Sequence, residues 1–228
     1  MKNYIRTLSS INVIKTEANL IALIEAKDID DEALIMVVEY ANLGTLESYI
    51  IEYYPEGLKE LHLFYFFFQI FSALKNIHLR EICLKNFSPK NILIKDFELK
   101  ISKFSESIEI CNFNKNDSNF WKKIDVFCLG NILYFMIFAS YPFKSSELNF
   151  NMSILDLDHL IENNQRKISG DLKLMLIKLL ANSDDRFFTK DIENCKWYNV
   201  NYQKYLKITQ HYPNQTHEFY HNYFSFEK

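Results

Sequence analysis

The residues of this chain that could bind a transition metal are its cysteines and histidines, and their spacing argues against a metal site. His217 and His221 lie four positions apart with His211 upstream, but no cysteine or acidic cluster lies nearby to complete a zinc site. The cysteines are too far apart in the sequence to form a zinc knuckle or a redox pair. The four of them are Cys83, Cys111, Cys128 and Cys195. We therefore expect free thiols and a reducing, intracellular compartment rather than a secreted protein.

Phosphate binding by a glycine-rich loop needs clustered glycines, which this chain lacks. It has four glycines, at positions 44, 57, 130 and 170, and the closest two are thirteen residues apart (57 − 44). A phosphate loop needs two or three glycines within a few residues, because the backbone must approach the phosphate closely. The sequence therefore excludes a Walker A loop and a Rossmann dinucleotide fingerprint.

The composition is that of a folded protein without a bulk attraction to polyanions. The chain has 228 residues, of which 48% are hydrophobic and 24% charged. Its 26 basic and 29 acidic residues give a net charge of −3, so we expect neither nucleic acid nor an anionic membrane as a partner. The length fits one domain or two small ones.

Hydrophobic patterning predicts a little β-structure followed mainly by helices. Two β-branched runs, residues 20–29 and 34–40, flank acidic residues and predict a β-hairpin. Residues 126–143 carry no charge, which fits either a buried helix or a membrane-spanning segment. The other predicted elements are helices over residues 3–15, 61–80, 155–163 and 171–181 and a second small hairpin over residues 92–101.

A family resemblance begins in residues 77–94, which read IHLREICLKNFSPKNILI. This segment resembles the catalytic loop of eukaryotic protein kinases, whose pattern is H-R-D-L-K-P-E-N-I-L. Residues 99–105 (LKISKFS) resemble the strand that leads into the family's D-F-G motif, and residues 125–134 resemble its D-V-W-S-L-G-V-I-L-Y. Further matches follow in the family's order at Tyr141-Pro142-Phe143, at residues 179–186 and at Trp197-Tyr198.

The resemblance implies an α+β fold of the protein-kinase type. Residues 1–41 would form a remnant N-lobe of one helix, a β-hairpin and the hinge, and residues 42–200 a mostly helical C-lobe. Residues 201–228 would form an aromatic, histidine-containing tail. The uncharged run 126–143 then becomes the buried central helix. Because the chain begins about where the family's third helix begins, we expect neither its glycine loop nor its V-A-I-K lysine.

The resemblance also implies which positions would carry phosphoryl transfer, and most of them hold a different residue type. Asn86 stands where the family has the aspartate that accepts the substrate proton, and an amide cannot accept it. Ser88 replaces the lysine that steadies the transferring phosphoryl group. Lys103 replaces the metal-binding aspartate of D-F-G, and a cation at this position would repel Mg²⁺. Only Asn91, the second position that contacts metal and nucleotide, matches the family.

Three matching positions also have structural interpretations. Asn91 would either contact metal or hold the loop by hydrogen bonds to its backbone, and we favour the second role. Asp125 in the family holds the backbone of the catalytic loop from the central helix, and we expect the same here. Arg186 in the family pairs with the glutamate of an A-P-E motif, which is missing from residues 106–124. We therefore expect Arg186 either to meet another carboxylate or to lie solvated.

Together these positions predict a catalytically inactive kinase-like module that binds another protein. The binding surface would be the remnant N-lobe or the aromatic tail, and no bound ATP or Mg²⁺ is expected, although Lys103 could meet a phosphate without metal. One alternative is an active or ancestrally active Ser/Thr kinase represented by an incomplete chain. A second alternative is a membrane-embedded protein, which the uncharged run would suggest.

Overall fold

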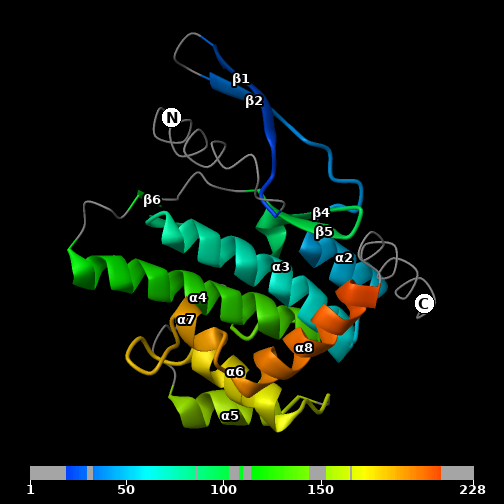
Figure 1. Cartoon of the computed structure of the whole chain (residues 1–228), viewed down its shortest axis with the longest axis vertical. Helices are drawn as coiled ribbons and strands as arrows, with labels where there is room; N and C mark the ends of the chain where they lie inside the picture. Colours follow the sequence, from blue (N-terminus) through cyan, green and yellow to red (C-terminus); the bar gives the residue numbers. More distant parts are fainter. Residues whose placement is uncertain are drawn as a thin grey trace.

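The computed structural model describes residues 19–29, 33–85, 87–102, 108–109, 114–143, 153–164 and 166–211. Figure 1 shows a mainly helical body from which one long β-hairpin projects. The order of a little β-structure followed by helices agrees with the sequence prediction. The helix predicted over residues 3–15 and the tail beyond residue 211 lie outside the described residues.

The projecting hairpin consists of β1 (Leu23–Ile29) and β2 (Ala33–Val38), as the two β-branched runs predict. The strands are antiparallel, with Ala26 opposite Met36 and a register shift between Leu23 and Glu25. Met36 packs against the core, whereas Ile35 and Val37 are 50% and 45% exposed. The hairpin therefore keeps an uncovered apolar face among the described residues.

The core is built around α3 (Glu60–Leu79), which follows α2 (Leu46–Tyr53). Apolar and aromatic side chains on most sides of α3 are buried, so most of this helix lies within the core. Trp197 lies edge-on to Phe64 and Phe67, with ring centroids 5.5 and 5.6 Å apart. The Trp197 indole donates a hydrogen bond to the Glu60 carboxylate over 2.9 Å, which satisfies its buried N–H.

The helix around the uncharged run differs from its predicted limits. Helix α4 spans Lys115–Phe138 rather than residues 126–143. It begins early because the Asn114 side chain caps it, accepting hydrogen bonds from the backbone N–H groups of Asn116 and Asp117. It ends early because Ala139 adopts a left-handed conformation with φ of 50°. None of the described helices combines the length and apolarity needed to cross a membrane.

The remaining helices complete the body below the hairpin (Figure 1). Helices α5 (Ile154–Glu162) and α6 (Gly170–Leu180) lie within one residue of their predicted positions, and the short α7 (Thr189–Ile192) follows. Helix α8 (Lys196–His211) crosses the boundary that the sequence analysis places at residue 200. It continues because Tyr202 and Tyr205 pack on Phe68 of α3, with ring centroids 5.6 and 4.8 Å apart.

The turn between α2 and α3 is fixed by one glycine and one arginine. Gly57 has φ of +84°, and a Cβ atom added there would overlap the carbonyl oxygen of Ile137. Arg166 donates hydrogen bonds to the carbonyls of Glu56, Leu58 and Ile137. This close contact joins the α2–α3 turn to the end of α4.

We expect Gly57→Ala to lower the unfolding free energy by about 2 kcal/mol or more, because the methyl group meets rigid backbone and the positive φ disfavours alanine. Gly170→Ala is the matched control, since its added Cβ would meet nothing within 4 Å at the start of α6. Urea unfolding of both variants measures the difference. Equal stability of the two variants would contradict the packing of this turn.

The burial of His62 in α3 leads to a separate prediction, about the pH dependence of stability. The His62 ring lies against Tyr54 and Phe66, and burial lowers its pKa from 6.5 to about 3. An unfolded histidine takes up a proton below pH 6.5 and the folded one does not, so acid favours unfolding. We expect His62 to cost the chain about 2 kcal/mol of unfolding free energy between pH 7 and pH 5. Urea unfolding at both pH values should show a smaller loss in His62→Phe, and an identical loss would contradict the burial.

Candidate active site

The segment that resembles a catalytic loop lies between α3 and two short strands. Strand β3 (Ile82–Cys83) pairs with β6 (Ile108–Glu109), and the short helix η1 (Pro89–Asn91) leads into β4 (Ile92–Lys95), which pairs with β5 (Glu98–Ile101). Of the predicted site residues, Ser88, Asn91, Asp125 and Arg186 are described, and Asn86 and Lys103 lie outside the described residues. The geometry of the loop is therefore described through the residues on either side of Asn86.

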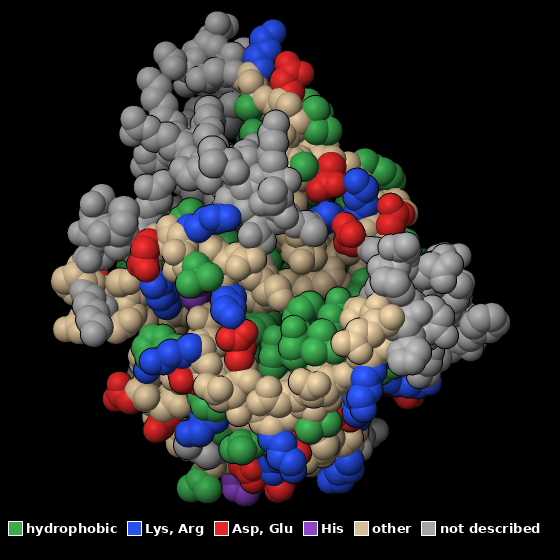
Figure 2. Space-filling view, viewed as in Figure 1, with side chains coloured by type: hydrophobic (Ala, Val, Ile, Leu, Met, Phe, Trp, Pro, Cys, Tyr) green, Lys and Arg blue, Asp and Glu red, His purple; other side chains and the backbone are tan. Residues whose placement is uncertain are grey.

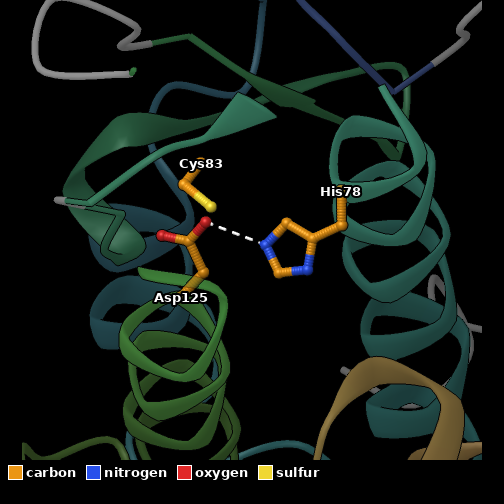
Figure 3. A group of neighbouring side chains, drawn as sticks. All are labelled: His78, Cys83 and Asp125. Carbon is orange, nitrogen blue, oxygen red and sulfur yellow. Dashed lines mark hydrogen bonds and ion pairs between the residues drawn. The ribbon is translucent and has the colours of Figure 1, made fainter. Parts of the chain in front are cut away.

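The carboxylate of Asp125 in α4 accepts hydrogen bonds from the start of this loop. Its Oδ1 accepts from the backbone N–H of Lys85 over 2.8 Å, and its Oδ2 accepts from that of Leu84 over 2.8 Å. The Nε2 atom of His78, at the end of α3, lies 2.9 Å from the same Oδ2 (Figure 3). One side chain thus joins α4, the loop and α3. The family resemblance implies that Asp125 holds the loop backbone, but it assigns no role to His78.

His78, Cys83 and Asp125 also gather three atoms of the kind that bind metals, all within 4.8 Å of one another. Their surroundings favour hydrogen bonding over coordination. Both carboxylate oxygens already accept backbone N–H groups, and a metal would have to displace them. Burial and the nearby Asp125 carboxylate raise the pKa of the Cys83 thiol, which disfavours the thiolate that a metal requires. We therefore interpret this cluster as a buried hydrogen-bonded clamp.

The end of the loop is held by the backbone of Asn91. Its N–H donates to the carbonyl of Ser88 over 2.9 Å. Its carbonyl accepts from both the backbone N–H and the hydroxyl of Ser102, over 2.9 and 2.8 Å. Within the described part of the chain, the hydrogen bonds of Asn91 all use its backbone. Ser102 directly precedes Lys103, so the two candidate metal positions are linked through one residue.

Arg186 lies in the core rather than in solvent, so the predicted solvated position is wrong. Its side chain is 4% exposed and stacks 4.7 Å from the Phe127 ring. It donates hydrogen bonds to the carbonyls of Ala181, after α6, and Lys123 in α4. Burial lowers the pKa of its guanidinium to about 10, so the group stays charged at neutral pH. The position is stable because these carbonyls replace the water that it loses.

Lys85 makes a contact that sequence reasoning missed. The resemblance places it where the family has the arginine of H-R-D, and its ammonium lies 4.3 Å from the Trp121 ring centroid. This is within the range of a cation–π interaction. Because Trp121 belongs to the early part of α4, the loop is attached to this helix on two sides, through Asp125 and through Trp121.

We expect Asp125→Ala to lower the unfolding free energy by about 3 kcal/mol, because it leaves two buried N–H groups and His78 without their acceptor. Asp184→Ala is the control, since this exposed aspartate should change stability by less than about 0.5 kcal/mol. Urea unfolding measures both, and limited proteolysis should show faster cleavage near residues 84–91 only in Asp125→Ala. Equal behaviour of the two variants would contradict the clamp.

Comparisons with known proteins agree with this arrangement. The family model for protein tyrosine and serine/threonine kinases matches residues 1–126. The crystal structure of the Rad53 kinase domain and SCD2 superposes with a TM-score of 0.69 at 19% sequence identity, covering 87% of this chain and 78% of that one. This likeness confirms the predicted kinase-like fold.

Curated relatives of the chain include two proteins named as protein kinases. The probable serine/threonine-protein kinase MARK-C of Dictyostelium discoideum is 25% identical over 213 residues, which is 83% of this chain and 27% of the relative. The carbon catabolite-derepressing protein kinase of Saccharomyces cerevisiae is 26% identical over 232 residues, which is 90% of this chain and 33% of the relative. The chain thus spans about a quarter to a third of the length of these relatives. With the matched family model and the shared fold, these likenesses establish that the chain belongs to the protein tyrosine and serine/threonine kinase family.

Proposed function

We propose that this chain is a kinase-like module without phosphotransferase activity, which works by binding another protein. The observation that carries the proposal is the residue set at the catalytic positions: Asn86, Ser88 and Lys103. Phosphoryl transfer depends on a carboxylate that orients the nucleophile and on cations held by carboxylates. An amide, a hydroxyl and an ammonium group supply neither.

The substitution at Lys103 has the largest expected effect on metal binding. Lys103 directly follows Ser102, which is hydrogen-bonded through its N–H and its hydroxyl to the carbonyl of Asn91. The two positions that hold Mg²⁺ in the family are therefore an asparagine and a lysine on neighbouring backbone. One amide oxygen is a poor site for a hard divalent cation, and an adjacent positive charge opposes it further. Neither ATP nor Mg²⁺ is proposed as a cofactor.

The scaffold of the loop is kept although its reactive groups are changed. The carboxylate of Asp125 still accepts the backbone N–H groups of Leu84 and Lys85, and η1 still joins the loop to β4. A protein that functions only through its folded surface would need these contacts for stability. It would not need the carboxylates that serve the reaction. This combination favours a binding function over catalysis.

The β1–β2 hairpin is the proposed binding surface. Five hydrophobic residues in or next to the hairpin are exposed. Single exposed hydrophobic side chains are normal on a protein surface, but a group of this kind indicates an interaction site. The five residues are Ile24, Ile35, Val37, Val38 and Tyr40. At the top of Figure 2 the hairpin carries hydrophobic side chains next to acidic and basic ones. The aromatic tail, the other predicted surface, lies outside the described residues beyond residue 211.

The alternative function is Ser/Thr phosphotransfer by a longer protein of which this chain is a part. Its support is the set of serine/threonine kinases that resemble the chain over more than three quarters of its length. Both functions share the fold and differ in whether the chain binds nucleotide and transfers a phosphoryl group. Nucleotide binding and phosphotransfer therefore separate them.

We expect the unfolding temperature of the purified chain to stay unchanged with ATP, and with ATP plus Mg²⁺. A ligand at 100 times its Kd would stabilise the fold by about 2.7 kcal/mol and raise that temperature by about 5–10 °C. A phosphotransfer assay with a generic protein substrate should show no product. The variant Asn86→Asp/Lys103→Asp restores two carboxylates and serves as the matched comparison.

The outcomes of this experiment distinguish the two functions. A Mg²⁺-dependent shift in the wild-type chain, together with phosphotransfer that Asn91→Ala abolishes, would overturn the proposal in favour of the kinase alternative. A shift with ATP alone that Lys103→Ala removes would mean that the module holds nucleotide without metal. A gain of the Mg²⁺-dependent shift in the double variant alone would tie the loss of binding to these two substitutions.

A further inference from the structure

The outer edge of β1, in the projecting hairpin, pairs with no strand among the described residues. In Figure 1 the hairpin stands away from the helical body. Among the described residues, β1 has one strand partner, β2, and the two form a separate two-stranded sheet. The backbone N–H and C=O groups on the other side of β1 are thus a template for a further strand. The occupant of this edge would be the protein partner of the proposed function, on which this inference rests.

The charged side chains along β1 indicate which kind of strand would pair with it. Glu25 lies opposite Val37 and Lys27 lies opposite Ile35, so both charges stand on the same face of the sheet as these two exposed apolar residues. Both charged side chains are exposed, and the structure gives neither an ion pair with another described residue. An edge with one acidic and one basic residue two positions apart is complementary to an antiparallel copy of itself.

We infer that β1 pairs antiparallel with β1 of a second copy of this chain, centred on Ala26, to form a continuous four-stranded sheet. In this register Ala26 faces its own equivalent. Glu25 of each copy then lies directly opposite Lys27 of the other, which gives two opposite-charge pairs on one face. Directly opposed cross-strand pairs of this kind stabilise a sheet, and like charges in that position destabilise it.

Neighbouring registers are excluded by the same charges. Centring the pair on Glu25 sets two glutamates against each other, and centring it on Lys27 sets two lysines against each other. A shift of the pairing by one position would oppose residues that lie on different faces of the strand, which a regular ladder does not allow. A lysine on an edge strand ordinarily discourages pairing. Here the Ala26-centred register supplies each Lys27 with a Glu25 of the other copy, whereas the Lys27-centred register opposes two lysines.

The pairing also places the apolar residues consistently. The two-fold axis of this register is perpendicular to the sheet, so Ile35 and Val37 of both copies lie on the same face as the charge pairs. The register shift at Ile24 interrupts β1, which limits the regular ladder to the few residues around Ala26. We therefore expect a reversible dimer that forms as the protein concentration rises, rather than an obligate one.

Sedimentation equilibrium of the full chain over a wide concentration range tests the inference with charge variants. Glu25→Lys and Lys27→Glu should each weaken self-association by about tenfold, because two attractive pairs become repulsive ones. The double variant Glu25→Lys/Lys27→Glu should restore it. An equimolar mixture of the two single variants should associate as a heterodimer, because each then carries the charges that the other lacks.

Lys167→Glu is the matched control, because it makes the same charge change at an exposed position between α5 and α6. It should leave self-association unchanged, and circular dichroism should show every variant folded. A wild-type chain that remains monomeric at all concentrations would overturn the inference, as would a dimer that the charge variants do not affect. Neither result bears on nucleotide binding or phosphotransfer, so the proposed absence of catalysis stands or falls separately.

Discussion

The carboxylate of Asp125 is the group on which the arrangement of the candidate site depends. It is fully buried, and a buried charge of this kind is tolerated only when hydrogen bonds replace its lost water. Here the replacements are two backbone N–H groups of the loop and the ring of His78. Because these partners belong to the loop and to α3, and Asp125 itself belongs to α4, their hydrogen bonds fix all three segments relative to one another. This requirement is independent of any reaction.

This independence explains how a kinase-like loop can persist without the groups of a kinase. The contacts that shape the loop are made by Asp125, by the backbone of Asn91 and by Lys85 against Trp121. None of these described contacts uses a side chain at a position that would act on a substrate. Replacing such side chains with Asn86, Ser88 and Lys103 therefore removes chemistry and leaves packing in place. Function and fold are separable at this site for a physical reason.

The β1–β2 hairpin differs from the buried loop: its two strands are paired with each other, but much of its apolar surface is exposed. A two-stranded sheet is marginally stable by itself. Here Met36 and the residues that precede β1 attach it to the core, and Ile21 donates a backbone hydrogen bond to Ile101 at the end of β5. The rest of its apolar surface is exposed. The proposed binding role rests on this exposed apolar surface.

The sequence alone determined the order of elements, most helix positions and the family resemblance, because periodicity and short motifs are local properties. It also determined which catalytic residue types are missing. The Asn114 cap that begins α4 is a local signal, which the uncharged run overshadowed. Only the tertiary structure decided how long α8 is, since the packing of Tyr202 and Tyr205 on Phe68 has no local signature. It likewise buried Arg186 and joined His78 to Asp125 across 47 positions. Such contacts arise from the way the core closes, which no short stretch of sequence encodes.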